Sequence, residues 1–145
     1  MKIYTIGFTR KSASQFFETL CSAQVKRVVD VRLNNVSQLA GFAKKHDLEY
    51  FLRKIGSIRY THALDLAPTQ EMLDAYKKGA GAWSEYESRF MELIQGRHIE
   101  ASWANELREG DCLLCSEEKP QNCHRRLVAE YFAHHFGEVE IQHLG

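Results

Sequence analysis

The stretch that decides the fold runs from residue 112 to residue 126 and reads Cys112-Leu113-Leu114-Cys115-Ser116-Glu117-Glu118-Lys119-Pro120-Gln121-Asn122-Cys123-His124-Arg125-Arg126. Its beginning is an apolar run typical of a buried strand, which we expect to span Asp111–Cys115. A polar turn follows, and from about Asn122 to His135 the composition favours a helix. A buried strand that leads through a polar turn into a helix is the unit from which parallel α/β sheets are built.

The same alternation extends in both directions along the chain. Further strands are expected at Ile3–Ile6, Arg27–Arg32, Ile58–His62 and Val139–His143. Helices are expected from Ser12 or Ser14 to about Val25, and over Phe42–Ile55, Thr69–Lys78, Ser84–Gln95 and Glu100–Arg108, with an irregular polar loop over Asn34–Gly41. Continuous apolar strands that alternate with helices indicate a parallel sheet buried on both faces. We therefore predict a three-layer α/β domain with a mostly parallel sheet of about five strands flanked by helices.

The bulk composition limits the class of protein. A chain of 145 residues has the usual size of one domain, so we expect residues 1–145 to fold as a single unit. Lys plus Arg and Asp plus Glu both number 19, and without a basic excess no generic nucleic-acid binding is expected. No apolar run approaches the ~18 residues of a membrane helix, and the N-terminus is too quickly polar for a signal peptide. Four cysteines in such a chain favour a reducing, cytoplasmic location, and the oligomeric state stays open.

Polar side chains follow several of the predicted strands, at the point where each strand ends. The carboxyl ends of parallel strands meet at one edge of a sheet, which is where α/β proteins bind ligands. We expect one cleft to be lined by Thr9, Arg10, Asp30, Arg32, Cys115, Glu117, Cys123 and Arg125, with His124 beside them at the helix start. Because ion pairs at a solvent-exposed edge add little stability, we expect Arg10, Arg32 and Arg125 to bind an anion rather than to stabilise the fold.

The four cysteines divide into two groups. Residues three apart on a strand point to opposite faces, so Cys112 is expected in the core, away from Cys115. Cys21, inside the first helix, is also expected in the core. With Asn122 as the cap or Pro120 in the first turn of the helix, Cys123 is expected near free N–H groups at the helix start, a position that lowers the pKa of a thiol. Cys115 and Cys123 are then the pair expected to lie close together.

Three motifs together carry a resemblance to a known family. At Tyr4-Thr5-Ile6-Gly7, at Asp30-Val31-Arg32, and from Leu113 through Glu117 and Pro120 to Cys123-His124-Arg125, the sequence resembles the DUF488 family of small bacterial and archaeal proteins of unknown function. The resemblance covers essentially the whole chain and implies the fold and the place of a site, without a substrate. The first turn usually reads Gly-His-Ser in such proteins, whereas this chain has Gly7-Phe8-Thr9.

The leading hypothesis is an enzyme that acts on a small anionic or nucleotide-like substrate at the carboxyl edge of the sheet. Cys115 or Cys123 would serve as the nucleophile or as a local donor, and Glu117 as general acid or base, with Asp30 as a possible partner. Thr9, Arg10, Arg32, His124 and Arg125 would bind the substrate. This chemistry requires no cofactor.

Three alternatives remain open. Cys115, Cys123 and His124, with Glu117 as a fourth ligand, have the ligand types of a zinc or iron site, although adjacent residues on a helix diverge by about 100°. A non-catalytic module that binds a nucleotide or a nucleic-acid end would explain Phe8 in place of the family histidine. A rhodanese-like or phosphatase-like thiol loop needs an arginine six residues after Cys115, where this chain has Gln121.

Overall fold

The computed structural model describes residues 1–35, 41–77, 81–117 and 119–145. Within these ranges five strands form one sheet in the order β3-β2-β4-β1-β5, and every neighbouring pair is parallel. The strands are β1 (Lys2–Gly7), β2 (Arg27–Asp30), β3 (Arg59–His62), β4 (Asp111–Cys115) and β5 (Glu140–His143). The predicted parallel α/β architecture is confirmed, as is the order of strands and helices along the chain.

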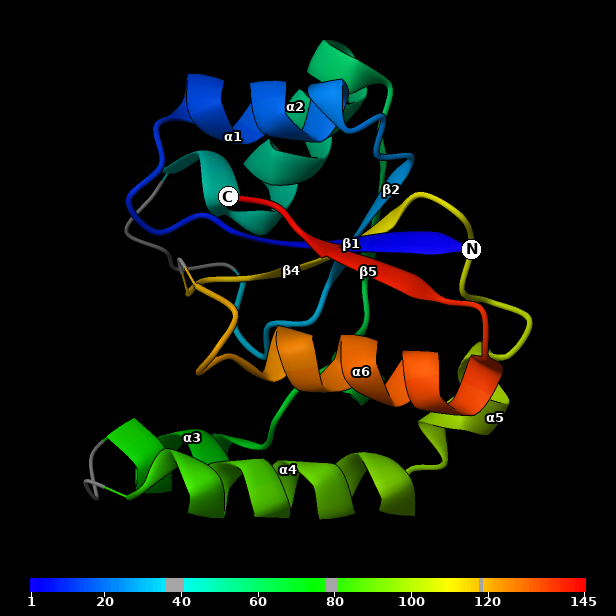
Figure 1. Cartoon of the computed structure of the whole chain (residues 1–145). Coiled ribbons are helices and arrows are strands. Elements are labelled where there is room, and N and C mark those ends of the chain that lie inside the picture. Colours follow the sequence, from blue (N-terminus) through cyan, green and yellow to red (C-terminus); the bar gives the residue numbers. More distant parts are fainter. Residues whose placement is uncertain (36–40, 78–80, 118) are drawn as a thin grey trace.

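Helices cover both faces of this sheet (Figure 1). One face carries α1 (Ala13–Ser22) and α2 (Lys45–Gly56), and α6 (His124–Phe136) packs directly on the other. On the α6 side also lie α3 (Gln70–Lys77), α4 (Trp83–Gly96) and α5 (Ile99–Trp103), with α3 and α4 farther from the sheet than α6. Two short 3-10 turns, η1 (Gly41–Ala43) and η2 (Leu64–Leu66), complete the described elements.

Local sequence signals explain where several helices begin and end. Ser12 caps α1 through a capping box, in which its side chain accepts from the Gln15 N–H and the Gln15 side chain accepts from the Ser12 N–H. Helix α2 ends at Gly56, and Ser57 closes it in a left-handed conformation. Helix α5 stops at Trp103, well before the predicted end at Arg108. Residues 36–40 of the predicted polar loop, and residue 78 at the end of the predicted third helix, lie outside the described residues.

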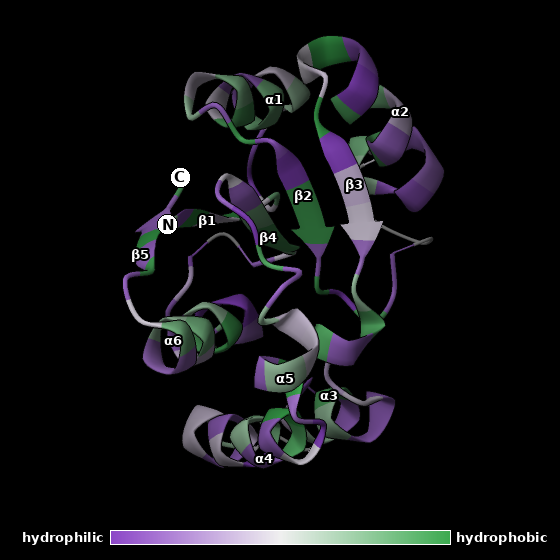
Figure 2. Ribbon diagram, turned by 90° about the vertical axis from the view of Figure 1, so that its right-hand side faces the viewer, coloured by the Kyte–Doolittle hydropathy of each residue, from purple (hydrophilic) through white to green (hydrophobic). Residues whose placement is uncertain are grey.

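The sheet separates two apolar cores, and the hydrophobic residues of its strands and of the helices around it are coloured green in Figure 2. Phe16, Leu20, Leu48 and Leu52 build the core under α1 and α2, and Phe90, Ile94, Leu127 and Phe132 belong to the core under α6. Because side chains alternate along a strand, β4 sends Cys112 and Leu114 to the first core and Leu113 and Cys115 to the second. The predicted burial of Cys112 on the face opposite Cys115 is confirmed.

The central strand β4 places the candidate site. The chain winds from β1 through α1, β2 and α2 to β3 on one side, then returns so that β4 enters between β1 and β2. The direction of winding therefore reverses at β4, and such a reversal opens a crevice at the carboxyl ends of the strands. Cys115 is the last residue of β4 and lies at this point.

Cys21 lies on the exposed side of α1. Cys21 is exposed, so its predicted place in the core is wrong: α1 buries Phe16, Phe17 and Leu20, and residue 21 falls outside that apolar stripe. None of the described helices combines the length and apolar character that crossing a membrane requires.

Candidate thiol and imidazole site

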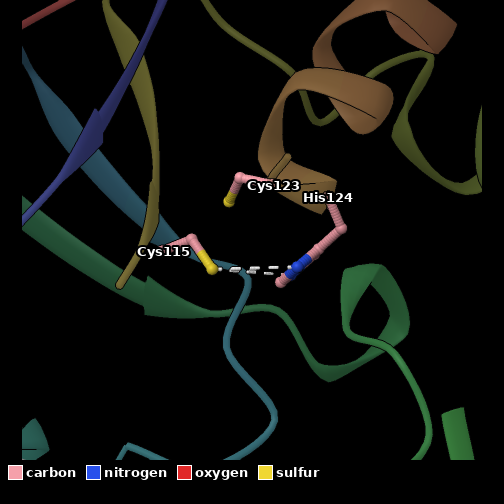
Figure 3. Close-up of side chains that lie close together, drawn as sticks. All are labelled: Cys115, Cys123 and His124. Carbon is pink, nitrogen blue, oxygen red and sulfur yellow. Dashed lines mark hydrogen bonds between the residues drawn. The ribbon is translucent and has the colours of Figure 1, made fainter. Parts of the chain in front are cut away.

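Three potential ligands or nucleophiles meet at the carboxyl end of β4 (Figure 3). The Sγ atoms of Cys115 and Cys123 and a ring nitrogen of His124 all lie within 4.8 Å of one another. The Cys115 sulfur is 3.7 Å from Nδ1 and 4.0 Å from Nε2 of His124. All three side chains are buried, with 6%, 2% and 6% of the surface of Cys115, Cys123 and His124 exposed. The predicted proximity of Cys115 and Cys123 is confirmed.

The start of α6 explains how two adjacent residues reach the same point. Cys123 is the N-cap, with φ of −139° and ψ of 136°, so its backbone is extended, and the helix begins at His124. Asn122 is therefore not the N-cap, and Pro120 does not lie in the first turn of the helix, so both predictions are wrong. The argument that adjacent residues diverge by about 100° holds for two helical residues and does not apply to an N-cap and its successor. The predicted divergence of Cys123 and His124 is therefore wrong.

A backbone hydrogen bond fixes the tautomer of His124. Its Nε2 lies 2.7 Å from the carbonyl oxygen of Val31. A carbonyl oxygen only accepts, so Nε2 carries a proton and donates it to Val31. Nδ1 is then the nitrogen left to interact with the Cys115 sulfur, 3.7 Å away, and the bond to Val31 holds the ring in place.

The electrostatics of the cluster favour a thiolate on Cys115. The hydrogen bond from Cys123, and next the charge of His124, hold the pKa of Cys115 well below its ordinary value, although burial opposes them. Burial alone would lower the pKa of His124, but attraction to Cys115 and the bonds to Cys115 and Val31 outweigh it, so the pKa is raised. Burial, and then the interaction with Cys115, raise the pKa of Cys123 well above its ordinary value. These directions favour the thiolate on Cys115 with Cys123 as the neutral donor to it, so the predicted lowering of the Cys123 pKa is wrong.

A cavity of about 270 Å³ opens over this cluster. Its base includes Cys115, Cys123 and His124, and Ser116, Glu117 and Asn122 from the loop before α6 line one side. The remaining lining comes from the loop after β2 and from the segment that contains α3 and α4, namely Arg32, Leu33, Asn34, Pro68, Leu73, Tyr76, Lys77, Trp83 and Tyr86. Glu117 thus lies where the sequence predicts it, with an exposed side chain at the cavity.

The aromatic part of this lining was not predicted from the sequence. Tyr76 and Tyr86 fall in predicted helices and Trp83 directly before one, without a predicted role at the site, and the third aromatic of α4, Phe90, is a core residue. The sequence does contain an indication of this wall, because the large aromatic residues Tyr76 and Trp83 flank the glycine-rich break at residues 79–81. That pattern does not show which aromatic faces remain uncovered, since this depends on how α3 and α4 pack on α6.

Thr9 and Arg125 lie beside the site but act on its loop. The Thr9 N–H and hydroxyl both donate to the carbonyl oxygen of Ser116, at 3.0 and 2.5 Å. Arg125 is fully buried and donates from Nη1 to the Glu117 carbonyl oxygen at 2.6 Å and from Nε to the Thr5 hydroxyl at 3.3 Å. Neither side chain belongs to the cavity lining. Their predicted place in the cleft is wrong, because both donate to backbone carbonyl oxygens of the loop after β4 instead of lining the cavity.

Asp30 and Arg32 form a buried ion pair, and of these two residues only Arg32 lines the cavity. The two Asp30 oxygens each accept a hydrogen bond of 2.8 Å from the Arg32 guanidinium, and Tyr60 donates to Asp30 at 2.6 Å. Arg32 also donates to the Ala43 carbonyl and is only 3% exposed. Val29 belongs to the α6-side core, so strand alternation turns Asp30 toward α2, away from Cys115. Asp30 is absent from the cavity lining, so its predicted place in the cleft is wrong, whereas Arg32 lines the cavity as predicted and its role in binding an anion stays a prediction.

Arg10 and Phe8 also lie away from the cavity. Arg10 lines a separate surface depression together with Lys11, Gln15 and Lys119. Phe8 is buried in the core of α1 and α2, with its ring centre 5.3 Å from the guanidinium carbon of Arg32. The position where DUF488 proteins usually have histidine therefore adds no side chain to the cavity lining.

Comparison with known proteins agrees with the motifs. The model of the family described as "Domain of unknown function DUF488" matches residues 12–132. The chain belongs to the DUF488 family. No curated protein and no solved structure matched it. The matched region includes β2, β4 and the whole of the Cys115–His124 cluster, so the site lies within the family domain.

Proposed function

We propose that this DUF488 protein is a thiol-dependent enzyme that acts on a small molecule bound in the cavity, with Cys115 as its nucleophile. The observation that carries the proposal is the Cys115–His124 contact of 3.7 Å at the base of a cavity. An activated nucleophile needs a base within reach and a third group that orients the base. Here His124 is the base, and the Val31 carbonyl orients it.

The proposed chemistry is transfer of a group to sulfur and then to water. The Cys115 thiolate attacks an electrophilic carbon and forms an S–C bond. The leaving group departs with its bonding electron pair and takes the proton from Nδ1 of His124. Water then attacks the S-linked intermediate, gives its proton to His124 or to Glu117, and releases the product and the thiolate. Cys123 stabilises the thiolate before the attack and after product release by donating a hydrogen bond.

The predicted arginine anion site is not part of this proposal. Arg32 donates from Nε and Nη2 to Asp30 and Ala43, which leaves its buried Nη1 without a hydrogen-bond partner among the described residues, and Arg125 holds the loop. Lys77, which is exposed and lines the cavity, is a better placed cation for an acidic group on the substrate.

A generic acyl donor tests the proposal before the substrate is known. In a Cys21→Ser background, which removes the exposed thiol, p-nitrophenyl acetate should give a burst of about one equivalent of p-nitrophenolate and an acetyl group on Cys115. His124→Gln should slow the burst, and Cys115→Ser should abolish it. An equal burst from the Cys115→Ser protein would exclude Cys115 as the nucleophile.

A metal site is a second candidate, favoured by a specific observation. Among the described residues, Cys115, Cys123 and His124 are the one group of three potential ligands with mutually close donor atoms. Their S–N separation of 3.7 Å is near the roughly 3.6 Å of a tetrahedral zinc site, and a donor to a backbone carbonyl is usual for a zinc-bound histidine. These three residues would hold Zn²⁺ or Fe²⁺, with Glu117 or water as the fourth ligand.

Elemental analysis separates the two candidates. Protein purified without chelator should contain far less than one equivalent of zinc or iron if the thiol enzyme is correct. One equivalent that is lost in both Cys115→Ser and Cys123→Ser would favour the metal site instead.

A further inference from the structure

The cavity has one wall built from aromatic rings. Tyr76 of α3 and Trp83 and Tyr86 of α4 all line it. Their ring centres lie 5.7 Å apart for Tyr76–Trp83, 5.2 Å for Tyr76–Tyr86 and 5.1 Å for Trp83–Tyr86, and the last pair is stacked at 22°. Three rings in mutual contact form a rigid surface with little conformational entropy to lose when a ligand binds.

This wall leads to the thiol cluster. Tyr86 stacks on Phe90 at 6.3 Å, and Phe90 lies 5.3 Å from the His124 ring. Tyr86 and Phe90 are buried, whereas Tyr76 and Trp83 remain partly exposed. Tyr76, Trp83 and Cys115 line the same cavity, so a molecule that fills it contacts both the aromatic wall and the thiol cluster.

The remaining lining of the cavity is polar. Ser116, Glu117 and Asn122 come from the loop before α6, and Lys77 extends the aromatic side with a positive charge. These side chains offer hydrogen-bond donors and acceptors to the edge of a ligand, while the aromatic wall offers a face. A volume of about 270 Å³ lies just below the range of drug-sized pockets, so the ligand has the size of a base or a nucleoside.

We infer that the cavity binds a planar heteroaromatic ring of the nucleobase type, stacked on Trp83, with the Tyr76 ring, which is inclined at 66° to Trp83, against its side and its polar edge toward Asn122 and Glu117. This assigns a substrate class to the proposed thiol enzyme and rests on that function for the chemistry, but the binding site itself requires no reactive Cys115. A planar ring in this position presents its edge to the sulfur.

Binding of matched ligands tests the inference directly. Adenosine and uridine are titrated into the protein by calorimetry, together with dihydrouridine, which keeps the hydrogen-bonding groups of uridine but has a puckered, non-aromatic ring. At least one of the two nucleosides should bind to one site, and if it is uridine, dihydrouridine should bind more weakly. Trp83→Ala should weaken binding by about 5–150-fold, the usual value of one stacked base, whereas Trp83→Phe should retain most of it.

Each outcome decides between the inference and its alternative. Absence of binding by both nucleosides, equal affinity for dihydrouridine, or equal affinity of the Trp83→Ala protein would each overturn the aromatic-wall assignment. If the p-nitrophenyl acetate burst persists in those cases, the thiol enzyme stands without this substrate class. If nucleosides bind, and bind equally well to Cys115→Ser, but the burst is absent, the ring site stands and the catalytic proposal fails.

Discussion

At the scale of single residues, the thiolate of Cys115 gives the most direct prediction. Because the pKa of Cys115 is lowered, its thiolate persists as the pH falls below the ordinary range of thiols. The rate of alkylation of Cys115 by iodoacetamide should therefore fall little between about pH 8.5 and about pH 6.5. Free N-acetylcysteine, measured alongside, should lose about tenfold per pH unit below its pKa. Peptide mass spectrometry reports each site, and a parallel decline for Cys115 would contradict the assignment.

The same experiment distinguishes the other cysteines. Cys21 is exposed and should be labelled in the folded protein, whereas Cys112 has no exposed surface and burial raises its pKa, so it should react only on unfolding. Labelling of Cys112 before Cys21 would contradict the strand assignment of β4.

The ion pair of Asp30 and Arg32 should contribute to stability. Arg32→Ala leaves the Asp30 carboxylate buried without its counter-ion, which costs about 3–5 kcal/mol. Urea unfolding monitored by circular dichroism gives the change in the free energy of unfolding. Arg59→Ala, an exposed position at the start of the neighbouring strand β3, is the matched control and should change stability by about 0.5 kcal/mol or less. If Arg32→Ala lowers the free energy of unfolding by less than about 1 kcal/mol, the ion pair does not stabilise the fold and the prediction is wrong.

At the scale of elements, the close approach of β1 and the loop after β4 makes Gly7 essential. A Cβ at residue 7 would lie 1.6 Å from the Glu117 carbonyl oxygen, far inside contact distance. Gly7→Ala should therefore displace the loop that carries Ser116 and Glu117. The rate of alkylation of Cys115 by iodoacetamide at about pH 6.5 should then fall at least tenfold relative to the parent protein. Gly96→Ala, at the end of α4 with open space around it, is the control and should leave both reactivity and fold intact.

Sequence patterns predict elements well because the signals are local. Apolar runs, the Ser12 cap and the stop at Gly56 depend on neighbours in the chain, and these predictions agree with the structure. The faces of individual side chains are also predictable where strand alternation is applied strictly, as for Cys112. The same rule, applied from Val29 to Asp30, would have placed Asp30 on the face opposite Cys115, and the error arose from grouping residues by edge alone.

The remaining errors at the site are tertiary in origin. The burial of Arg32 depends on its contact with Ala43, and that of Arg125 on its contacts with Thr5 and the Glu117 carbonyl. These partners are distant in sequence or lie in a loop whose path the sequence does not predict. The aromatic wall likewise exists because α3 and α4 pack outside α6. Local composition carries little information about such contacts.

At the scale of the whole molecule, the two ends of the sheet have different tasks. The carboxyl end holds the cavity and the cluster of Cys115, Cys123 and His124. The amino end holds a buried ion pair in which Arg27 of β2 donates to both oxygens of Asp111 of β4, at 3.0 and 2.7 Å, and also to Glu106. β2 and β4 are the strands that flank the reversal of winding, so the Arg27–Asp111 ion pair fixes their register at the end of the sheet away from the cavity.

This division predicts that stability and reactivity can be separated by substitution. Asp111→Ala leaves the Arg27 guanidinium buried with one exposed partner, and we expect it to lower the free energy of unfolding by about 3–5 kcal/mol. Glu106→Ala is the matched control on the same arginine: its carboxylate is 52% exposed, so the loss should be about 1 kcal/mol or less. In the folded protein both variants should keep the parent rate of Cys115 alkylation within about twofold, because no contact of the Cys115–His124 pair is removed. Urea unfolding and alkylation kinetics on the same samples check both quantities. A large fall in Cys115 reactivity in Asp111→Ala, measured where the protein is still folded, would show that the site depends on the register of the entire sheet rather than on the loop and helix that surround it.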